Sequence, residues 1–140
     1  MDIYWFDINR DYVNKRGEEY WKLNPPESWT LGRNDDRIKY STSECKAEIG
    51  DVVIFYQTGI KSVQHLGEVY KIDTEHDGDY VYFKINVLLK KPIPIVEIRI
   101  AFEELKNYPP QGGVSQMKDD KFEAGKRLIE FIENKSQSEK

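Results

Sequence analysis

The sequence predicts an α+β protein built on a small β-barrel of five to six strands with peripheral helices. Three observations carry this prediction. Residues 49–57 open on the turn pair Gly50-Asp51 and continue with β-branched and aromatic residues, as a strand buried on both faces does. A second strand carries Gly67, where a missing side chain lets another backbone or a flat ligand come close, and the two predict the central hairpin of the barrel. Residues 119–134 place apolar side chains at helical spacing and predict a helix that packs on the barrel.

Length and composition fit one globular domain. The 140 residues are enough for a core, and charged residues make up 33% of the chain and aromatic residues 13%. No apolar run approaches the roughly 20 residues needed to cross a bilayer, and the N-terminus lacks the layout of a secretory signal. We therefore expect one domain over residues 1–134, a tail or the beginning of a linker over residues 135–140, a cytoplasmic location and no contact with a membrane.

The N-terminal third predicts one strand followed by irregular segments. Residues 3–8 predict a short aromatic strand. Residues 9–22 predict an irregular helix or helical loop, which the pair Pro25-Pro26 ends. The polar residues 27–43 predict a long loop, and loops of this length in compact domains are usually functional or disordered.

Beyond the hairpin the sequence predicts a long strand and shorter elements. Residues 80–89 are the longest strand candidate. Pro92 and Pro94 then force an extended exit, since neither can donate a hydrogen bond to a ladder. Residues 97–105 predict a short strand or one helical turn before the loop that leads to the final helix.

Standard catalytic and metal-binding motifs are absent from the sequence. Cys45 is the single cysteine and His65 and His76 are the only histidines, so a zinc site would need carboxylates to complete it. There is no phosphate-binding loop, nucleophile elbow or metalloprotease motif. No pair of carboxylates stands out by its spacing as a hydrolytic pair. We expect no metal and no cofactor, and we favour a binding module over an enzyme.

Aromatic side chains stand where a packed core does not obviously need them. Trp29 lies in the polar loop, so its indole either folds back onto the core or presents a flat face to a ligand. Trp21 ends the first helical segment, where packing and ligand-binding roles are equally open. A stacked nucleobase gains about 1–3 kcal/mol per ring. Asp7, Asn9 and Thr30 can add hydrogen bonds to the edge of a base, although a strand-end turn and a helix cap are the commoner uses of these residue types.

The net charge of −4 argues against a protein that coats nucleic acid through bulk electrostatics. The sequence still allows a local basic face, because lysine and arginine cluster in three places. These side chains are either ordinary solvated charges or contacts to the phosphates that flank a bound base. The candidates are Arg33, Arg37, Lys39, Lys61, Lys90 and Lys91.

The order of the segments carries more information than any one of them. In chain order these are the aromatic strand of residues 3–8, Ser28-Trp29-Thr30, residues 49–56, Gly67-Glu68-Val69, the proline-ended strand of residues 82–94, and residues 111–115. This set resembles the PUA-like superfamily and, within it, the EVE domain and its relative the YTH domain. The resemblance covers most of the chain, from about residue 3 to residue 132.

The resemblance implies a reader of modified bases, because EVE-like and YTH-like domains hold a methylated or otherwise modified nucleotide in an aromatic cage. Trp29 would match one cage wall, with Thr30 beside it, and Asp7 with Asn9 would match the strand end that reads the base edge. YTH domains take the second wall from a later tryptophan, which this chain lacks, since its three tryptophans all lie before residue 30. Trp21, or a tyrosine or phenylalanine, would have to replace it.

The resemblance also implies a context. Prokaryotic domains of this kind commonly stand at the N-terminus of McrB-type, modification-dependent restriction proteins, which implies fusion or partnership with an AAA+ GTPase motor and a nuclease subunit. The sequence thus predicts a non-catalytic module that flips a methylated base of DNA into an aromatic cage. Two alternatives stay open: an RNA-binding PUA-like module, and a protein-interaction domain in which Trp21 and Trp29 anchor a partner.

Overall fold

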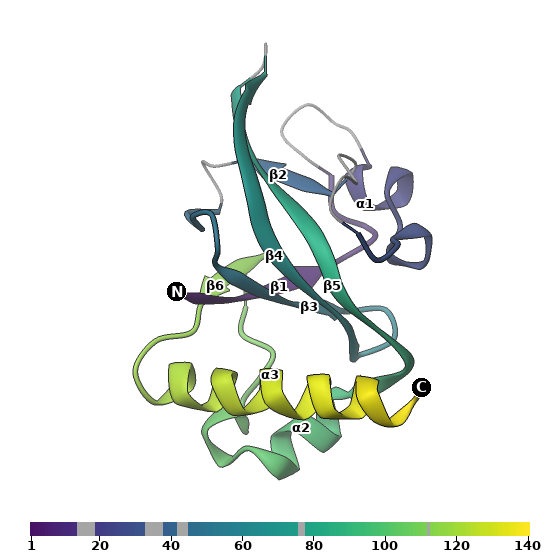
Figure 1. Ribbon diagram of the computed structural model, residues 1–140, viewed down its shortest axis with the longest axis vertical. Coiled ribbons are helices and arrows are strands. Elements are labelled where there is room, and N and C mark those ends of the chain that lie inside the picture. Colours follow the sequence, from purple (N-terminus) through teal and green to yellow (C-terminus); the bar gives the residue numbers. More distant parts are fainter. Residues whose placement is uncertain (14–18, 33–37, 42–44, 76–77, 112) are drawn as a thin grey trace.

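The computed structural model describes residues 1–13, 19–32, 38–41, 45–75, 78–111 and 113–140, and its strands form one six-stranded sheet (Figure 1). The α+β class and the six strands agree with the sequence prediction. The elements in chain order are β1 (Ile3–Ile8), α1 (Tyr20–Leu23), the 3-10 helix η1 (Pro26–Ser28), β2 (Lys39–Ser41), β3 (Val52–Gln57), β4 (Ser62–Glu75), β5 (Gly78–Pro94), α2 (Ile95–Ala101), the 3-10 helix η2 (Glu103–Leu105), β6 (Val114–Gln116) and α3 (Asp120–Ser138).

The sheet is mixed and strongly curled. Its strand order is β2-β5-β4-β3-β1-β6, and only the pair β1 and β3 is parallel. Three strands separate β2 from β1, yet the rings of Tyr40 on β2 and Phe6 on β1 lie with their centroids 4.7 Å apart. The curl therefore brings the first strand of the sheet order across to the fifth. In the part of the chain that the structure describes, β2 and β6 remain sheet edges, so the result is a half-barrel rather than the closed barrel that the sequence predicts.

Strand β1 is buried on both faces and separates two apolar cores. Trp5 faces the core formed with α2 and α3, where Ile98 and Leu128 are fully buried. Phe6 faces the opposite core, which holds Trp21 of α1. Figure 1 shows α2 and α3 on one side of the sheet and α1 on the other. The predicted packing of the C-terminal helix on the sheet is confirmed. Among the helices of the described segments, α3 included, none combines the length and the apolarity of a membrane-spanning helix.

Several short elements differ from the sequence prediction. In residues 9–22 the described helix is only α1, and residues 14–18 lie outside the described part of the chain. The predicted loop of residues 27–43 contains β2, and residues 97–105 form most of α2 and all of η2. Strand β2 has three residues, too few for an alternating pattern, and it exists because it pairs with the long strand β5.

Part of the segment that the sequence predicts as a tail or the beginning of a linker, residues 135–140, is helical. Helix α3 continues to Ser138, and the carboxylate of Glu139 accepts hydrogen bonds from the backbone N–H groups of Lys90 and Lys91, each at 2.9 Å. These two bonds lower the pKa of Glu139 below its usual range. The end of the chain thus covers backbone donors of β5 at a stretch where β2 does not reach.

Other atoms lie close to Gly67 of β4, as the sequence predicts, and they belong to the protein rather than to a ligand. A Cβ atom on Gly67 would lie 2.6 Å from Cε2 of Phe55 and 3.2 Å from the backbone oxygen of Lys84. Gly67→Ala is therefore expected to lower the free energy of unfolding by about 1–3 kcal/mol, because the core ring and the neighbouring strand must both shift. Chemical denaturation measures this loss. Gly59→Ala is the control, since no atom lies within 4 Å of its Cβ position, and an equal effect of the two variants would contradict the packing argument.

Candidate functional site

A cavity of about 620 Å³ opens at the carboxyl end of β1, within the size range of small-molecule sites. Its lining comes from β1 and the following turn, α1, β2, the turn after β3 and the start of β6. The lining residues are Asp7, Asn9, Tyr12, Trp21, Tyr40, Thr58, Gly113 and Val114. Of the residues that the sequence predicts for the site, the structure brings three together here: Asp7, Asn9 and Trp21.

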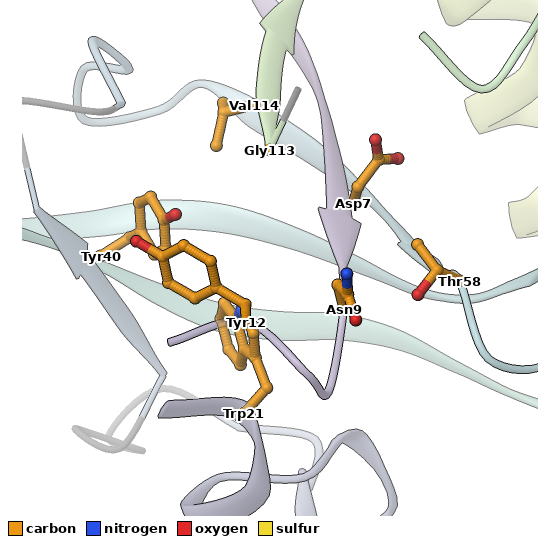
Figure 2. Close-up of a pocket in the computed structure, with 8 residues that line it drawn as sticks. All are labelled: Asp7, Asn9, Tyr12, Trp21, Tyr40, Thr58, Gly113 and Val114. Carbon is orange, nitrogen blue, oxygen red and sulfur yellow. The ribbon is translucent and has the colours of Figure 1, made fainter. Parts of the chain in front are cut away.

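The cavity curves around the end of β1 and has two unlike sides. Figure 2 shows the rings of Tyr12, Trp21 and Tyr40 on one side of the strand end, and the carboxyl group of Asp7 on the other. Neighbouring residues of a strand point to opposite faces, so Asp7 shares the face of Trp5, whereas Phe6 faces the aromatic rings. One side of the cavity is therefore aromatic and the other is polar.

The aromatic side is a cluster of three rings, of which two are stacked. Trp21 and Tyr40 are nearly parallel, with an interplanar angle of 8° and ring centroids 6.0 Å apart. Tyr12 lies beside Tyr40 with centroids 6.3 Å apart. Trp21 is only 1% exposed and Tyr40 only 8%, while Tyr12 is half-buried. Trp21 and Tyr40 thus form the floor of the aromatic side, and Tyr12 is the ring nearest to solvent.

The polar side centres on Asp7. The indole N–H of Trp5 donates a 2.8 Å hydrogen bond to Oδ1 of Asp7, and the backbone N–H of Asp7 donates to the carbonyl of Gly113 at 2.7 Å. Burial raises the pKa of Asp7 to about 6, although the bond from Trp5 acts in the opposite direction. Burial likewise raises the pKa of Tyr108 to about 12, and the charges of Asp120 and Asp7 add to that rise.

Asn9 and Thr58 shape the rim between the two sides. Oδ1 of Asn9 accepts the backbone N–H of Asp11 at 2.9 Å, and the Asn9 carbonyl accepts the N–H of Tyr12 at 3.0 Å. Asn9 therefore closes the turn at the end of β1, and this turn positions the Tyr12 ring. The hydroxyl of Thr58 donates to the carbonyl of Ile8 at 3.2 Å. Across the described residues, no group of histidine, cysteine or carboxylate side chains is arranged to hold a metal ion.

Trp29 does not line this cavity, and here the structure differs from the prediction. Its indole is 3% exposed, and its N–H donates to the carbonyl of Asn24 at 3.1 Å. The ring packs against Phe55 and His65, with centroids 5.0 Å away in each case. The sequence leaves open whether Trp29 packs in the core or contacts a ligand. In the structure it packs in the core, because the loop folds back over β3 and β4. Thr30 is exposed and also lies outside the cavity lining.

The predicted phosphate contacts do not line the cavity either. Arg33 and Arg37 lie outside the described residues. The ammonium group of Lys39 pairs with the carboxylate of Glu75 at 2.5 Å and lies over the ring of Tyr80, 4.7 Å from its centroid. Lys39 is thus held along the hairpin of β4 and β5, on the strand position next to Tyr40.

The remaining three lysines lie on other parts of the surface. Lys61 is exposed in the turn between β3 and β4, and its φ angle is 50°. Lys90 donates from its ammonium group to the carbonyl of Glu139 at 2.8 Å, and Lys91 is exposed beside it at the end of α3. Their predicted contacts with phosphate stay a prediction.

The sequence prediction does not include the other lining residues, which are Tyr12, Tyr40, Thr58, Gly113 and Val114. Tyr12 and Tyr40 are tyrosines within polar segments, which is the signal that singled out Trp29. The sequence does not show that Tyr12 and Tyr40 line the cavity while Trp29 does not, because this depends on the curl of the sheet.

The fold and the cavity together define an α+β domain with a curled six-stranded sheet and a cavity at the end of β1. No family model and no curated protein matches this sequence. Among solved structures, human THYN1 in complex with DNA that contains 5-methylcytosine has a TM-score of 0.51 and 12% identity, with 95% of this chain and 98% of that chain covered. A serine-to-alanine variant of the ASCH protein of Zymomonas mobilis has a TM-score of 0.55 and 10% identity, over 92% of this chain and 95% of that one. At these identities the likeness establishes the fold.

Proposed function

We propose that this domain is a non-catalytic module that binds nucleic acid and recognises a methylated base of DNA, flipped from the duplex into the cavity at the end of β1. The observation that carries the proposal is an aromatic floor beside hydrogen-bonding groups in one cavity. The fold gives further support, because THYN1, which shares it, has been solved with DNA that contains 5-methylcytosine.

The energetics of base flipping are compatible with such a cavity. Extruding a base costs a few kcal/mol, and each stacked ring returns about 1–3 kcal/mol. In this proposal Tyr12 stacks on the base, with Trp21 and Tyr40 beneath, and Asp7 and Asn9 contact its edge. Burying a methyl group adds only about 0.8 kcal/mol, so much of the discrimination must come from the rejection of better hydrated, unmodified bases.

Two of the predicted roles change in this proposal. Trp29 supports Trp21 from the core, since their ring centroids are 5.9 Å apart, and does not contact the base. Of the basic residues that the structure describes, Lys61, Lys90 and Lys91 are the exposed candidates for the flanking phosphates. Arg33 and Arg37 remain candidates from the sequence alone.

Tyr12→Ala tests the proposal, because this ring is the least buried of the three. The variant is expected to bind a duplex with one 5-methylcytosine about 5- to 150-fold more weakly than the wild type, through the loss of one stacking ring. Fluorescence anisotropy measures the affinity for methylated and plain duplexes and for a matched RNA. Tyr12→Phe should keep most of the binding.

Phe122→Ala on α3 is the matched control, since it removes a half-buried ring on the other side of the sheet. Unchanged binding by Tyr12→Ala would remove the aromatic side from the site. Preference for the matched RNA would favour the RNA-binding alternative, and failure to bind any oligonucleotide at low salt would favour a protein partner.

The proposal includes a role as the specificity domain of a modification-dependent restriction system, joined to an AAA+ GTPase motor and a nuclease. This part rests on the resemblance to EVE-type domains of McrB-type proteins. Cells that carry the gene in its native surroundings should then accept a methylated plasmid less efficiently than an unmethylated one, and equal transformation would contradict this role.

A further inference from the structure

Only one of the two carboxylate oxygens of Asp7 accepts a side-chain hydrogen bond from the residues that the structure describes. Oδ1 is held by the indole N–H of Trp5 at 2.8 Å. Trp5 is fully buried between the rings of Tyr56 and Tyr108, with centroids 5.5 Å and 4.9 Å away. Oδ2 accepts no hydrogen bond from the residues that the structure describes, and Asp7 lines the cavity. Trp5 is therefore a positioning residue that fixes the carboxyl group while Oδ2 remains available.

The groups around Asp7 offer its negative charge little compensation. Tyr56 of β3 and Tyr108 face it, and burial is the largest cause that raises the pKa of both phenols. Arg99 of α2 donates to the carbonyl of Tyr108 at 2.5 Å, and Asp120 of α3 adds a second negative charge near Tyr108. Asp7 forms no ion pair with any described cation. A ligand that enters the cavity displaces more water and disfavours the carboxylate further.

We propose that the cavity takes an uncharged ligand with Asp7 in its protonated form, so that binding near pH 7.5 takes up about one proton from solvent onto Oδ2. The protonated carboxyl then donates its O–H to an acceptor on the ligand, and Oδ1 can accept an N–H from the same edge. The edge of an uncharged nucleobase presents such a neighbouring acceptor and donor. This inference rests on the proposed function for the class of ligand. A cationic ligand would instead keep the carboxylate ionised.

The test measures affinity as a function of pH. The probe is a duplex with one 5-methylcytosine, bound by the full chain between pH 5.5 and pH 7.5. Because the neutral fraction of a carboxyl group with a pKa of about 6 falls about 25-fold over this range, the wild type should bind about 25-fold more weakly at pH 7.5. Asp7→Asn should bind equally well at both pH values, since its amide keeps the Oδ1 acceptor and supplies a permanent donor. Glu97→Gln, which removes an exposed carboxylate of α2, should keep the wild-type slope.

A second measurement needs no variant. Titration calorimetry at pH 7.5 in two buffers with different ionisation enthalpies should report an uptake of about one proton per duplex bound. Wild-type binding with a flat pH profile and no proton uptake would overturn this inference and leave the proposed function standing. Tighter binding at pH 7.5 would also overturn it, since the carboxylate form would then be the binding form. An absence of binding by either protein at every pH would remove the proposed function and this inference together.

Discussion

Replacing Trp29 with alanine is expected to lower the free energy of unfolding by about 3–5 kcal/mol. The indole is fully enclosed, with its N–H bonded to Asn24 and its faces against Phe55 and His65. Truncation would leave a cavity that rigid neighbours on β3 and β4 cannot fill. Chemical denaturation followed by circular dichroism measures the loss.

Two further variants serve as controls for Trp29→Ala. Thr30→Ala changes the next, exposed residue of the same loop and should alter the unfolding free energy by less than about 0.5 kcal/mol. Trp29→Phe should recover part of the lost stability, because it keeps a ring against Phe55. If Trp29→Ala instead unfolded like the wild type and lost only its preference for methylated DNA, the indole would be a ligand contact, as the sequence suggested.

The different fates of Trp21 and Trp29 show what local sequence can predict. Both tryptophans stand in short, polar, proline-containing surroundings, and for Trp21 the sequence leaves packing and ligand binding equally open. Both indoles are buried in the same apolar core, and of the two only Trp21 also lines the cavity. The choice depends on β2, whose Tyr40 stacks on Trp21. Because β2 has three residues and pairs with a strand about forty positions later, no local pattern reveals it.

Elements with a strong local pattern were predictable. The hairpin of β3 and β4, the long strand β5 and the helix α3 follow from β-branched runs and helical spacing. The close approach at Gly67 also follows, because a glycine within a strand marks a backbone that lacks room for a side chain. The helical conformation of residues 135–138 was not predictable, because their polar side chains resemble those of a tail. The hydrogen bonds between Glu139 and the backbone of β5 are seen only in the fold.

The sequence predicts the polar side of the cavity only in part. The sequence placed Asp7 and Asn9 at the end of the first strand, and the structure finds both in the lining. It could not show that Asp7 and the aromatic rings lie on opposite sides of β1, because that depends on how the turn after Ile8 folds. The bond from Trp5, two residues earlier on the same face, is a regular consequence of strand geometry.

His65→Leu is expected to remove most of the acid sensitivity of folding in the pH range from about 6.5 to 4. His65 is fully buried on β4 against Trp29, and neither ring nitrogen makes a hydrogen bond of ordinary geometry with the described residues. Burial lowers the pKa of the imidazole from 6.5 to about 4, and the backbone of Pro26 acts in the opposite direction.

The sign of the effect follows from the proton count. Between pH 4 and pH 6.5 the unfolded chain binds a proton at His65 that the folded chain does not, so stability rises with pH in this window. The contribution of His65 is complete above pH 6.5 and is lost as the pH falls towards 4, by about 3 kcal/mol in total. The raised pKa of Asp7 acts oppositely, because the folded chain there binds the extra proton.

The measurement therefore compares the free energy of unfolding of His65→Leu with that of the wild type at each pH. Urea denaturation at pH 4.5 and pH 7.5 should show that His65→Leu gains about 2–3 kcal/mol over the wild type at the lower pH, relative to the higher one. At pH 7.5 the variant should be at least as stable, because it removes two buried nitrogens without partners among the described residues. Asp7→Asn measures the opposing slope separately. An equal stability difference between His65→Leu and the wild type at both pH values would show that this imidazole keeps its ordinary pKa, and hence that its nitrogens find partners in solution.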